Sequence, residues 1–200
     1  MAILEHEIVS AALDRTGVQR HVFTRQAYYA MGEMGLLDRR VELIEGEIVD
    51  MAPIGPSHGA VPEPLVLLLQ QAFGTGFSVR NQAAISIGDD TKPSDPQPDV
   101  AVVVGTWRDY VHRQPTPDDI KLAVEIAESS LGFDRKIKSV LYASAGIPEY
   151  WIVNLAKRQV EVYRDPAEDG YESTTTYNAD QSIEPLLAPG SVVDVSQFMP

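Results

Sequence analysis

The chain contains two apolar segments rich in β-branched residues, Gln97-Pro98-Asp99-Val100-Ala101-Val102-Val103-Val104 and Leu122-Ala123-Val124-Glu125-Ile126-Ala127. This composition predicts buried strands over 99–104 and 120–127. Each segment carries a single carboxylate, Asp99 or Glu125. A buried carboxylate is costly unless a cation or strong donors satisfy it. Two such carboxylates in consecutive strands therefore outline a metal site.

Side chains alternate across a strand, so the second segment has two different faces. Its large apolar side chains share one face and are expected to build core: Leu122, Val124 and Ile126. Glu125 points to the other face, where Ala123 and Ala127 are small and leave room for a ligand.

The bulk composition is that of one globular domain. The 200 residues suffice for a sizeable core, which we expect over 23–200 after a short arm at 1–22. There is no cysteine, which excludes disulfides and thiolate metal sites and makes the cytoplasm the expected compartment. We expect no secretory signal and no membrane partner, because the N-terminus lacks a basic region before an apolar stretch and the apolar runs are short.

The formal net charge of −13 argues against tight, non-specific binding of nucleic acid, because phosphate binding requires clustered Lys and Arg. It does not exclude a nuclease, since carboxylates that hold a divalent cation count as negative until the cation is bound. The sequence has no zinc-type histidine spacing, Walker phosphate loop, dinucleotide glycine fingerprint or Gly-x-Ser-x-Gly elbow.

Turn residues and apolar periodicity predict a mixed order of elements. Helices are expected over 25–34, 62–73 and 133–145, and a hairpin over 41–51 turns at Gly46. Strands are expected over 77–87, 99–104, 120–127, 150–153 and 160–164, with edge strands over 171–177 and 192–195. Loops are expected over 53–57, 88–98 and 105–119. This order is typical of an α/β or α+β domain around a mixed sheet.

The helix predicted over 133–145 offers a counter-charge for the two carboxylates. Asp134, Lys138 and Tyr142 form an i, i+4, i+8 row on one edge of its apolar face, and Lys136 lies on the opposite edge. The apolar face itself consists of Phe133, Ile137, Val140 and Leu141. Only one of the two lysines can therefore lean toward a site at the end of a strand, and the spacing does not say which.

Each of these residues also has an ordinary structural interpretation. Glu125 could lie on an edge strand and face water, and Lys138 could be a solvated helix residue paired with Asp134. Glu42, beside the hairpin turn, is of a kind that usually lies on a polar face. His58, in Gly55-Pro56-Ser57-His58, is typically a surface residue or a partner for a helix start. The loop over 105–119 is either a surface segment, which we prefer, or a cover for substrate.

The chain resembles the Uma-type restriction endonuclease family of the PD-(D/E)XK (restriction-endonuclease-like) superfamily. The resemblance rests on segments that occur in order over most of 23–165. They are Val41-Glu42-Leu43-Ile44-Glu45-Gly46-Glu47-Ile48, Pro53-Ile54-Gly55-Pro56-Ser57-His58, Pro96-Gln97-Pro98-Asp99-Val100-Ala101, Val124-Glu125-Ile126-Ala127, Asp134-Arg135, Lys138, Leu141-Tyr142-Ala143, and Ala145-Gly146-Ile147-Pro148-Glu149-Tyr150-Trp151-Ile152-Val153. The last segment is the most specific.

The resemblance implies a restriction-endonuclease-like fold, a central mixed β-sheet flanked by helices with the site at one end of the sheet. It also implies a role for four residues. Asp99, Glu125 and Glu42 would hold Mg²⁺ or Mn²⁺ through oxygen ligands. Lys138 would orient the attacking water or stabilise charge on the phosphate. The superfamily signature has a lysine where this chain has Ala127, and Lys138 on the following helix would take its place.

The implied function is divalent-metal-dependent hydrolysis of DNA phosphodiester bonds by a homodimeric endonuclease. Two alternatives remain open. The chain could be a catalytically silent nuclease-fold protein that binds a partner or dimerises. Its acidic composition and its predicted edge strands favour this alternative. It could also be a metal-dependent hydrolase of small phosphoesters, which needs no basic groove.

Overall fold

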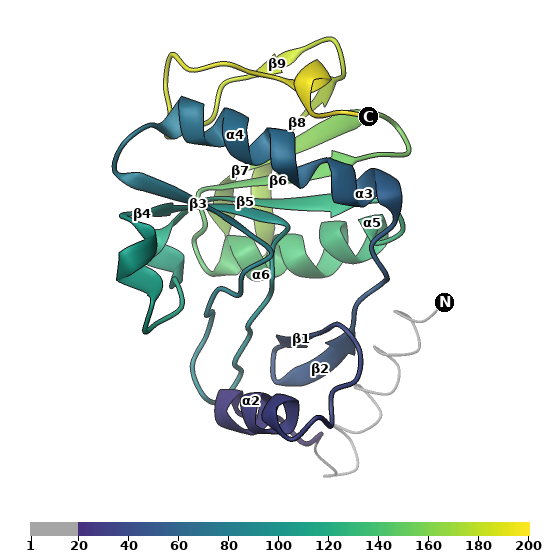
Figure 1. Cartoon of the computed structure of the whole chain (residues 1–200), viewed down its shortest axis with the longest axis vertical. Coiled ribbons are helices and arrows are strands. Elements are labelled where there is room, and N and C mark those ends of the chain that lie inside the picture. The colour runs from purple at the N-terminus through teal and green to yellow at the C-terminus, as the bar shows by residue number, and fades with distance from the viewer. Residues whose placement is uncertain (1–19) are drawn as a thin grey trace.

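The computed structural model describes residues 20–200, and its centre is a six-stranded sheet in the order β3-β4-β5-β6-β7-β8 (Figure 1). The strands are β3 (Phe77–Asn81), β4 (Val100–Val104), β5 (Ile120–Ala127), β6 (Glu149–Asn154), β7 (Gln159–Ala167) and β8 (Gly170–Asn178). Strands β5 and β6 pair in parallel, and all other neighbours pair antiparallel. The predicted mixed sheet flanked by helices is confirmed.

Helices cover both faces of the sheet (Figure 1). On one face lies α4 (Pro62–Phe73), together with the C-terminal elements β9 (Ser182–Ile183), β10 (Val193–Asp194) and the 3-10 helix η4 (Val195–Gln197). On the other face lies the helical segment made of α5 (Leu131–Phe133), the π-helix η3 (Asp134–Lys138) and α6 (Ser139–Ser144). This segment links the parallel pair β5 and β6, since parallel neighbours need a long crossover.

The central strand β5 separates two cores, whereas its alternation predicts core on only one of its faces. Leu122, Val124 and Ile126 are buried in the core under α4, whereas Ala123 and Ala127 are buried in the core under α6. The register between β4 and β5 shifts where Val102 pairs with Leu122 and Val103 pairs with Ile120. One extra residue of β5 lies between these two pairs and forms a β-bulge. The bulge turns Ile120 toward the α6 side.

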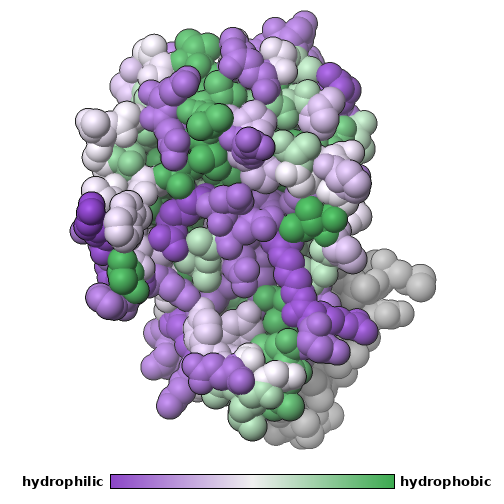
Figure 2. Space-filling view, viewed as in Figure 1, coloured by the Kyte–Doolittle hydropathy of each residue, from purple (hydrophilic) through white to green (hydrophobic). Residues whose placement is uncertain are grey.

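A second part of the molecule holds α2 (Arg25–Glu33) and the hairpin of β1 (Val41–Ile44) and β2 (Glu47–Asp50). Thr24 caps α2 as expected, because its hydroxyl accepts from the Ala27 N–H. Buried Asp95 joins this part to the rest, since it accepts from Arg25 and Tyr29 and its N–H donates to the Leu43 carbonyl. On the face in Figure 2, hydrophilic residues gather between the parts that carry α4 and α2.

Some boundaries differ from the sequence-based expectation. The strand predicted over 77–87 ends at Asn81, because Gln82 adopts a positive φ of 47°. The strand predicted from residue 99 begins at Val100, so Asp99 lies immediately ahead of it. The loop predicted over 53–57 ends in a short helix, α3 (Pro56–Ala60), which carries His58.

The predicted loop over 105–119 contains two 3-10 helices, η1 (Trp107–Tyr110) and η2 (Pro117–Asp119). Each begins with a capping box, formed by Thr106 with Asp109 and by Thr116 with Asp119. The segment leaves β4 at the end opposite Asp99, so it does not cover the two predicted carboxylates.

The helix after β5 turns a different face to the sheet than its apolar periodicity predicts. Its buried residues include Asp134, Lys138 and Tyr142, whereas Val140, expected on the apolar face, is 37% exposed. The Ser139 N–H donates to the Asp134 carbonyl five residues back, which makes one wide π turn. Such a turn shifts the phase of the residues that follow it and is frequent at functional sites.

No described helix has both the length and the apolar composition to cross a membrane. The N-terminal arm predicted over 1–22 lies mostly outside the described residues.

The hairpin turn depends on Gly46, and this can be tested by substitution. Gly46 has a φ of +77°, and a Cβ there would collide with Cγ1 of Val22. We expect Gly46→Ala to lower the free energy of unfolding by about 2–3 kcal/mol, measured by urea denaturation. Gly35→Ala is the matched control, because Gly35 has a φ of +71° and open space around its Cα. It should cost about 1 kcal/mol. Equal losses would contradict a role for the collision.

Candidate active site

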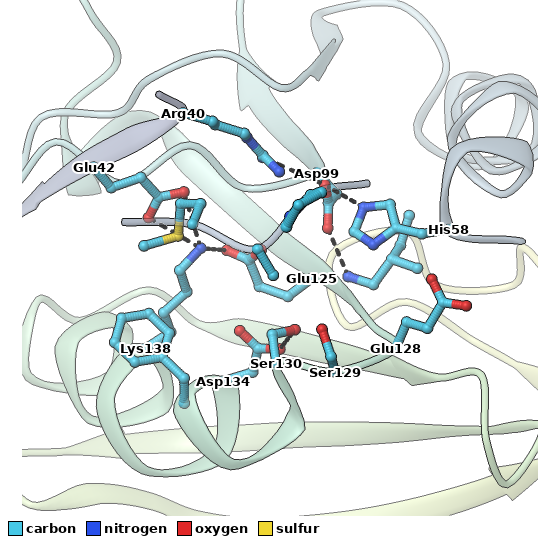
Figure 3. A pocket seen from close by; sticks show the side chains of 15 residues that line it. Arg40, Glu42, His58, Asp99, Glu125, Glu128, Ser129, Ser130, Asp134 and Lys138 are labelled. Atoms are coloured by element: carbon cyan, nitrogen blue, oxygen red, sulfur yellow. Dashed lines mark hydrogen bonds and ion pairs between the residues drawn. The ribbon is translucent and has the colours of Figure 1, made fainter. Parts of the chain in front are cut away.

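The four residues predicted for the site line one pocket (Figure 3). They lie in four separate parts of the fold: Glu42 on β1, Asp99 directly before β4, Glu125 on β5 and Lys138 on η3. Arg40, His58 and Asp134 line the same pocket. The pocket therefore combines carboxylates with several cationic or ionisable nitrogen groups, between the hairpin, the end of the sheet and the helix after β5.

The ammonium of Lys138 lies between two buried carboxylates (Figure 3). Its Nζ donates to Glu125 Oε1 at 2.8 Å and to Glu42 Oε1 at 3.2 Å. The exposed fraction of the Lys138 residue is only 3%. Burial alone would lower its pKa, but the negative charges of Glu125 and Glu42 outweigh burial and raise the pKa above its ordinary range. Lys138 is therefore positively charged at neutral pH, and Lys136 on the opposite edge is exposed.

Glu125 receives two hydrogen bonds on a single oxygen. Its Oε1 accepts from Lys138 and, at 2.8 Å, from the hydroxyl of fully buried Tyr142. No described residue donates to its Oε2. Burial raises the pKa of Glu125 well above its ordinary value, and the neighbouring carboxylates add to this effect against the pull of Lys138. The carboxyl group is thus held in one orientation by Oε1, which leaves Oε2 for a proton or another ligand.

Asp99 is held by a different set of donors. Its Oδ1 accepts from His58 Nε2 at 2.9 Å and from Gln82 Nε2 at 3.3 Å, and its Oδ2 accepts from the Ile126 N–H at 2.8 Å. Burial would raise the pKa of Asp99, but the bond from His58 and the adjacent positive charges lower it. Asp99 is therefore an ionised carboxylate fixed against the backbone residue that follows Glu125.

Asp134 adds a fourth buried carboxylate at the edge of the pocket. It is 2% exposed, and its Oδ2 accepts from the Ser130 hydroxyl at 2.6 Å. Burial is the largest cause that raises the pKa of Asp134, partly offset by Ser130 and Lys138. Like-charge repulsion among these acids is compensated chiefly by Lys138, so the pocket favours a further positive charge.

The chemical type of these side chains suits a hard divalent cation, but their positions do not yet form a binding site for one. Carboxylate oxygens are the ligands that Mg²⁺ and Mn²⁺ prefer. Buried Glu42 Oε2 lies 3.1 Å from Lys138 Nζ yet has no hydrogen-bond partner, which leaves an acceptor for such an ion. Among the described residues, however, no three His, Asp or Glu side chains already converge in a metal-binding group. The residues fit a divalent ion if the carboxylates around Lys138 reorient.

Several residues of the pocket were not assigned a function from the sequence. His58 had no assigned role, yet it bonds Asp99. The sequence places Tyr142 only on the row with Lys138 and assigns no role to Arg40. One signal could have found Arg40, because it lies two residues before Glu42 and an extended chain puts such residues on one face.

Comparison with known proteins gives a family and a similar fold. The family model Uma2, described as "Putative restriction endonuclease", matches residues 26–196. The chain belongs to the Uma2 family. Among solved structures, it is similar to one described as "a putative nuclease belonging to DUF820" from Anabaena variabilis, at 17% identity and a TM-score of 0.61 over 80% of this chain and 90% of that chain. A search of curated proteins gives no match. The Uma2 match and the fold support a nuclease.

The charge of Lys138 can be tested by its removal. Lys138→Met leaves Glu42 and Glu125 buried without their cation, so we expect a loss of about 3–5 kcal/mol in unfolding free energy at pH 8. The loss should shrink as the pH falls toward 5, because protonation then neutralises the carboxylates. Lys136→Met is the control at an exposed position and should change stability by less than about 0.5 kcal/mol. A loss that does not depend on pH would contradict the electrostatic account.

The raised pKa of Glu125 predicts that its charge costs stability. Above the ordinary value of 4.5, the unfolded chain ionises Glu125 more readily than the folded protein does, so wild-type stability declines as pH rises toward the folded pKa. Glu125→Gln keeps an Oε1 acceptor and removes this charge. In metal-free buffer at pH 8 its melting temperature should exceed that of wild type by a few degrees, and the gain should vanish near pH 4.

Glu172→Gln, on the exposed edge of β8, is the matched control and should leave the melting temperature unchanged. A Glu125→Gln protein that melts below wild type at pH 8 would show that the carboxylate stabilises the metal-free fold.

Proposed function

We propose that this protein is a divalent-metal-dependent endonuclease that hydrolyses phosphodiester bonds of DNA. The observation that carries the proposal is the convergence of Glu42, Asp99, Glu125 and Lys138 in one pocket, within a chain of the Uma2 family. Carboxylates brought together from separate elements carry a desolvation and repulsion cost. That cost has a functional explanation if the carboxylates bind a cation.

Glu42, Asp99 and Glu125 are the residues that would hold Mg²⁺ or Mn²⁺. When bound, such an ion supplies Lewis-acid polarisation of a phosphate oxygen and lowers the pKa of a water molecule. The chain's own contribution is orientation. Tyr142 and Lys138 hold Glu125 by Oε1, and His58 and the Ile126 N–H hold Asp99. Preorganised groups of this kind need little rearrangement during the reaction.

The two alternatives differ in what the pocket would do. A silent binding protein would bury the same carboxylates without a function to offset their cost. A hydrolase of small phosphoesters suits the net charge of −13, which opposes a broad DNA footprint. Supercoiled plasmid, single-stranded DNA and the chromogenic diester bis(p-nitrophenyl) phosphate separate these possibilities. Cleavage of the chromogenic diester without nicking of either DNA would favour the small-substrate hydrolase.

The homodimer and the cytoplasmic location belong to the same proposal. Strand β8 forms one edge of the sheet, and most of its residues are exposed or half-buried, so its backbone can pair with a second copy. The absence of cysteine in the sequence fits a reducing compartment. Light scattering of the purified chain measures the oligomeric state directly.

Metal binding and cleavage should depend on the same carboxylates. Mn²⁺ should stabilise wild type by mass action, and the melting temperature should rise. At a Mn²⁺ concentration one hundred times the dissociation constant, the gain in unfolding free energy is about 2.7 kcal/mol. Asp99→Asn and Glu125→Gln should lose this increment and lower plasmid nicking by at least about a hundredfold. Glu172→Gln should keep both.

The proposal fails if wild type neither gains stability with Mn²⁺ or Mg²⁺ nor cleaves any of the three substrates. It also fails if Asp99→Asn and Glu125→Gln fold and cleave like wild type.

A further inference from the structure

The guanidinium of Arg40 lies on the wall of the acidic pocket and donates no hydrogen bond to a described residue. It immediately precedes β1, lines the pocket, and has a side chain that is 30% exposed. Two residues later, Glu42 enters the same pocket, as expected for neighbours on one face of an extended chain. Figure 3 shows Arg40 directed toward Asp99 from the hairpin side. Its charge is therefore accessible from the pocket.

The hydrogen-bond donors of Arg40 remain unused among the described residues. Its nearest anion is Asp99 Oδ1, at 3.9 Å from Nη2, which is an ion pair beyond hydrogen-bond distance. Other arginines of the chain make direct bonds to carboxylates: Arg25 to Asp95 at 2.6 Å, Arg135 to Glu161 at 2.8 Å and Arg164 to Glu149 at 2.7 Å. Arg40 instead approaches Asp99 as an ion pair without a hydrogen bond.

Asp99 takes its hydrogen bonds from donors other than Arg40. Its two oxygens already accept from His58, Gln82 and the Ile126 N–H. The guanidinium therefore keeps a planar set of N–H donors for a ligand in the pocket. This donor fork matches the oxygens of a phosphate group in geometry and charge.

Lys138 is poorly placed for that task. Its ammonium is buried, and two of its three N–H donors already bond Glu42 and Glu125, so it has fewer donors for a phosphate than Arg40 has. The roles expected of a single lysine thus divide between two residues. Lys138 holds the carboxylates, and the contact with the substrate phosphate falls to Arg40.

We infer that Arg40 binds the non-bridging oxygens of a substrate phosphodiester in this pocket. The inference rests on the proposed function and adds to it the residue that contacts the substrate. It also locates one point of positive charge that a strongly acidic chain can direct at nucleic acid. A single contact of this kind predicts weak binding that depends on the bound ion and on Arg40 together.

The test compares Arg40→Gln and Arg40→Lys with Arg39→Gln. Arg39 is the matched control, because it directly precedes Arg40, does not line the pocket, and among residues 20–200 makes only an exposed ion pair to Asp50. Binding of a short fluorescein-labelled DNA duplex is measured by anisotropy in Ca²⁺ across a salt series. Turnover of plasmid and of bis(p-nitrophenyl) phosphate is measured in Mn²⁺, and Mn²⁺ affinity is measured by calorimetry.

Arg40→Gln should weaken DNA binding by about 10- to 100-fold, the loss expected for hydrogen bonds to a charged group. It should reduce the slope of binding against salt by about one unit. Its Mn²⁺ affinity should stay within about threefold of wild type, because Arg40 is not a ligand. Arg40→Lys should recover part of the binding, since it restores charge without the fork. Arg39→Gln should remain near wild type.

The inference is overturned if Arg40→Gln binds and cleaves like wild type, or if Arg39→Gln loses binding by the same factor, which would reflect net charge alone. Failure of the proposed function is recognised separately on wild type, as absence of Mn²⁺ binding and of all cleavage. If wild type binds Mn²⁺ but hydrolyses only the chromogenic diester, the inference is tested by the KM for that diester. The KM of Arg40→Gln must then be higher than that of wild type.

Discussion

The ammonium of Lys138 between Glu42 and Glu125 is the interaction on which the site depends. It joins the hairpin, whose Glu42 lies 96 residues earlier in the chain, to the central strand β5 and the π turn of the following helix. One buried lysine would be costly alone, and so would each buried carboxylate. Together they compensate one another, which ties the placement of the hairpin against the sheet to the charge balance of the pocket. Stability and chemistry are therefore coupled in the same contact.

Most of the central sheet could be predicted from sequence because its signals are local. The alternation of Leu122, Val124 and Ile126 correctly predicts the side chains that β5 gives to the core under α4. The opposite face is not open as expected, because Ala123 and Ala127 are buried in a second core under α6. Element ends were less predictable, since they depend on single backbone angles. The positive φ of Gln82 ends β3 early, and nothing in the local composition announces it.

The site shows the same division between local and tertiary information. Glu125 follows from the alternation along its strand. Helix spacing offers both Lys138 and Lys136, and the resemblance to a family is what selects Lys138. The partners of Asp99 do not follow from spacing, because His58, Gln82 and the Ile126 N–H come together only when α3, the end of β3 and β5 are packed. Helical periodicity was also misleading at Val140, because a π turn rotates the residues after it.

Lys138 compensates the negative charges of Glu42 and Glu125 in this pocket. An ion that attracts Glu42 and Glu125 competes with Lys138 for their oxygens. Both bonds to Glu125 end on Oε1, so Oε2 can serve an ion while Lys138 and Tyr142 keep their contacts. Glu42 likewise has Oε2 without a hydrogen bond. With some reorientation of their side chains, Glu42 and Glu125 would hold a divalent cation, and the cation would add positive charge to a pocket with more carboxylates than Lys138 neutralises.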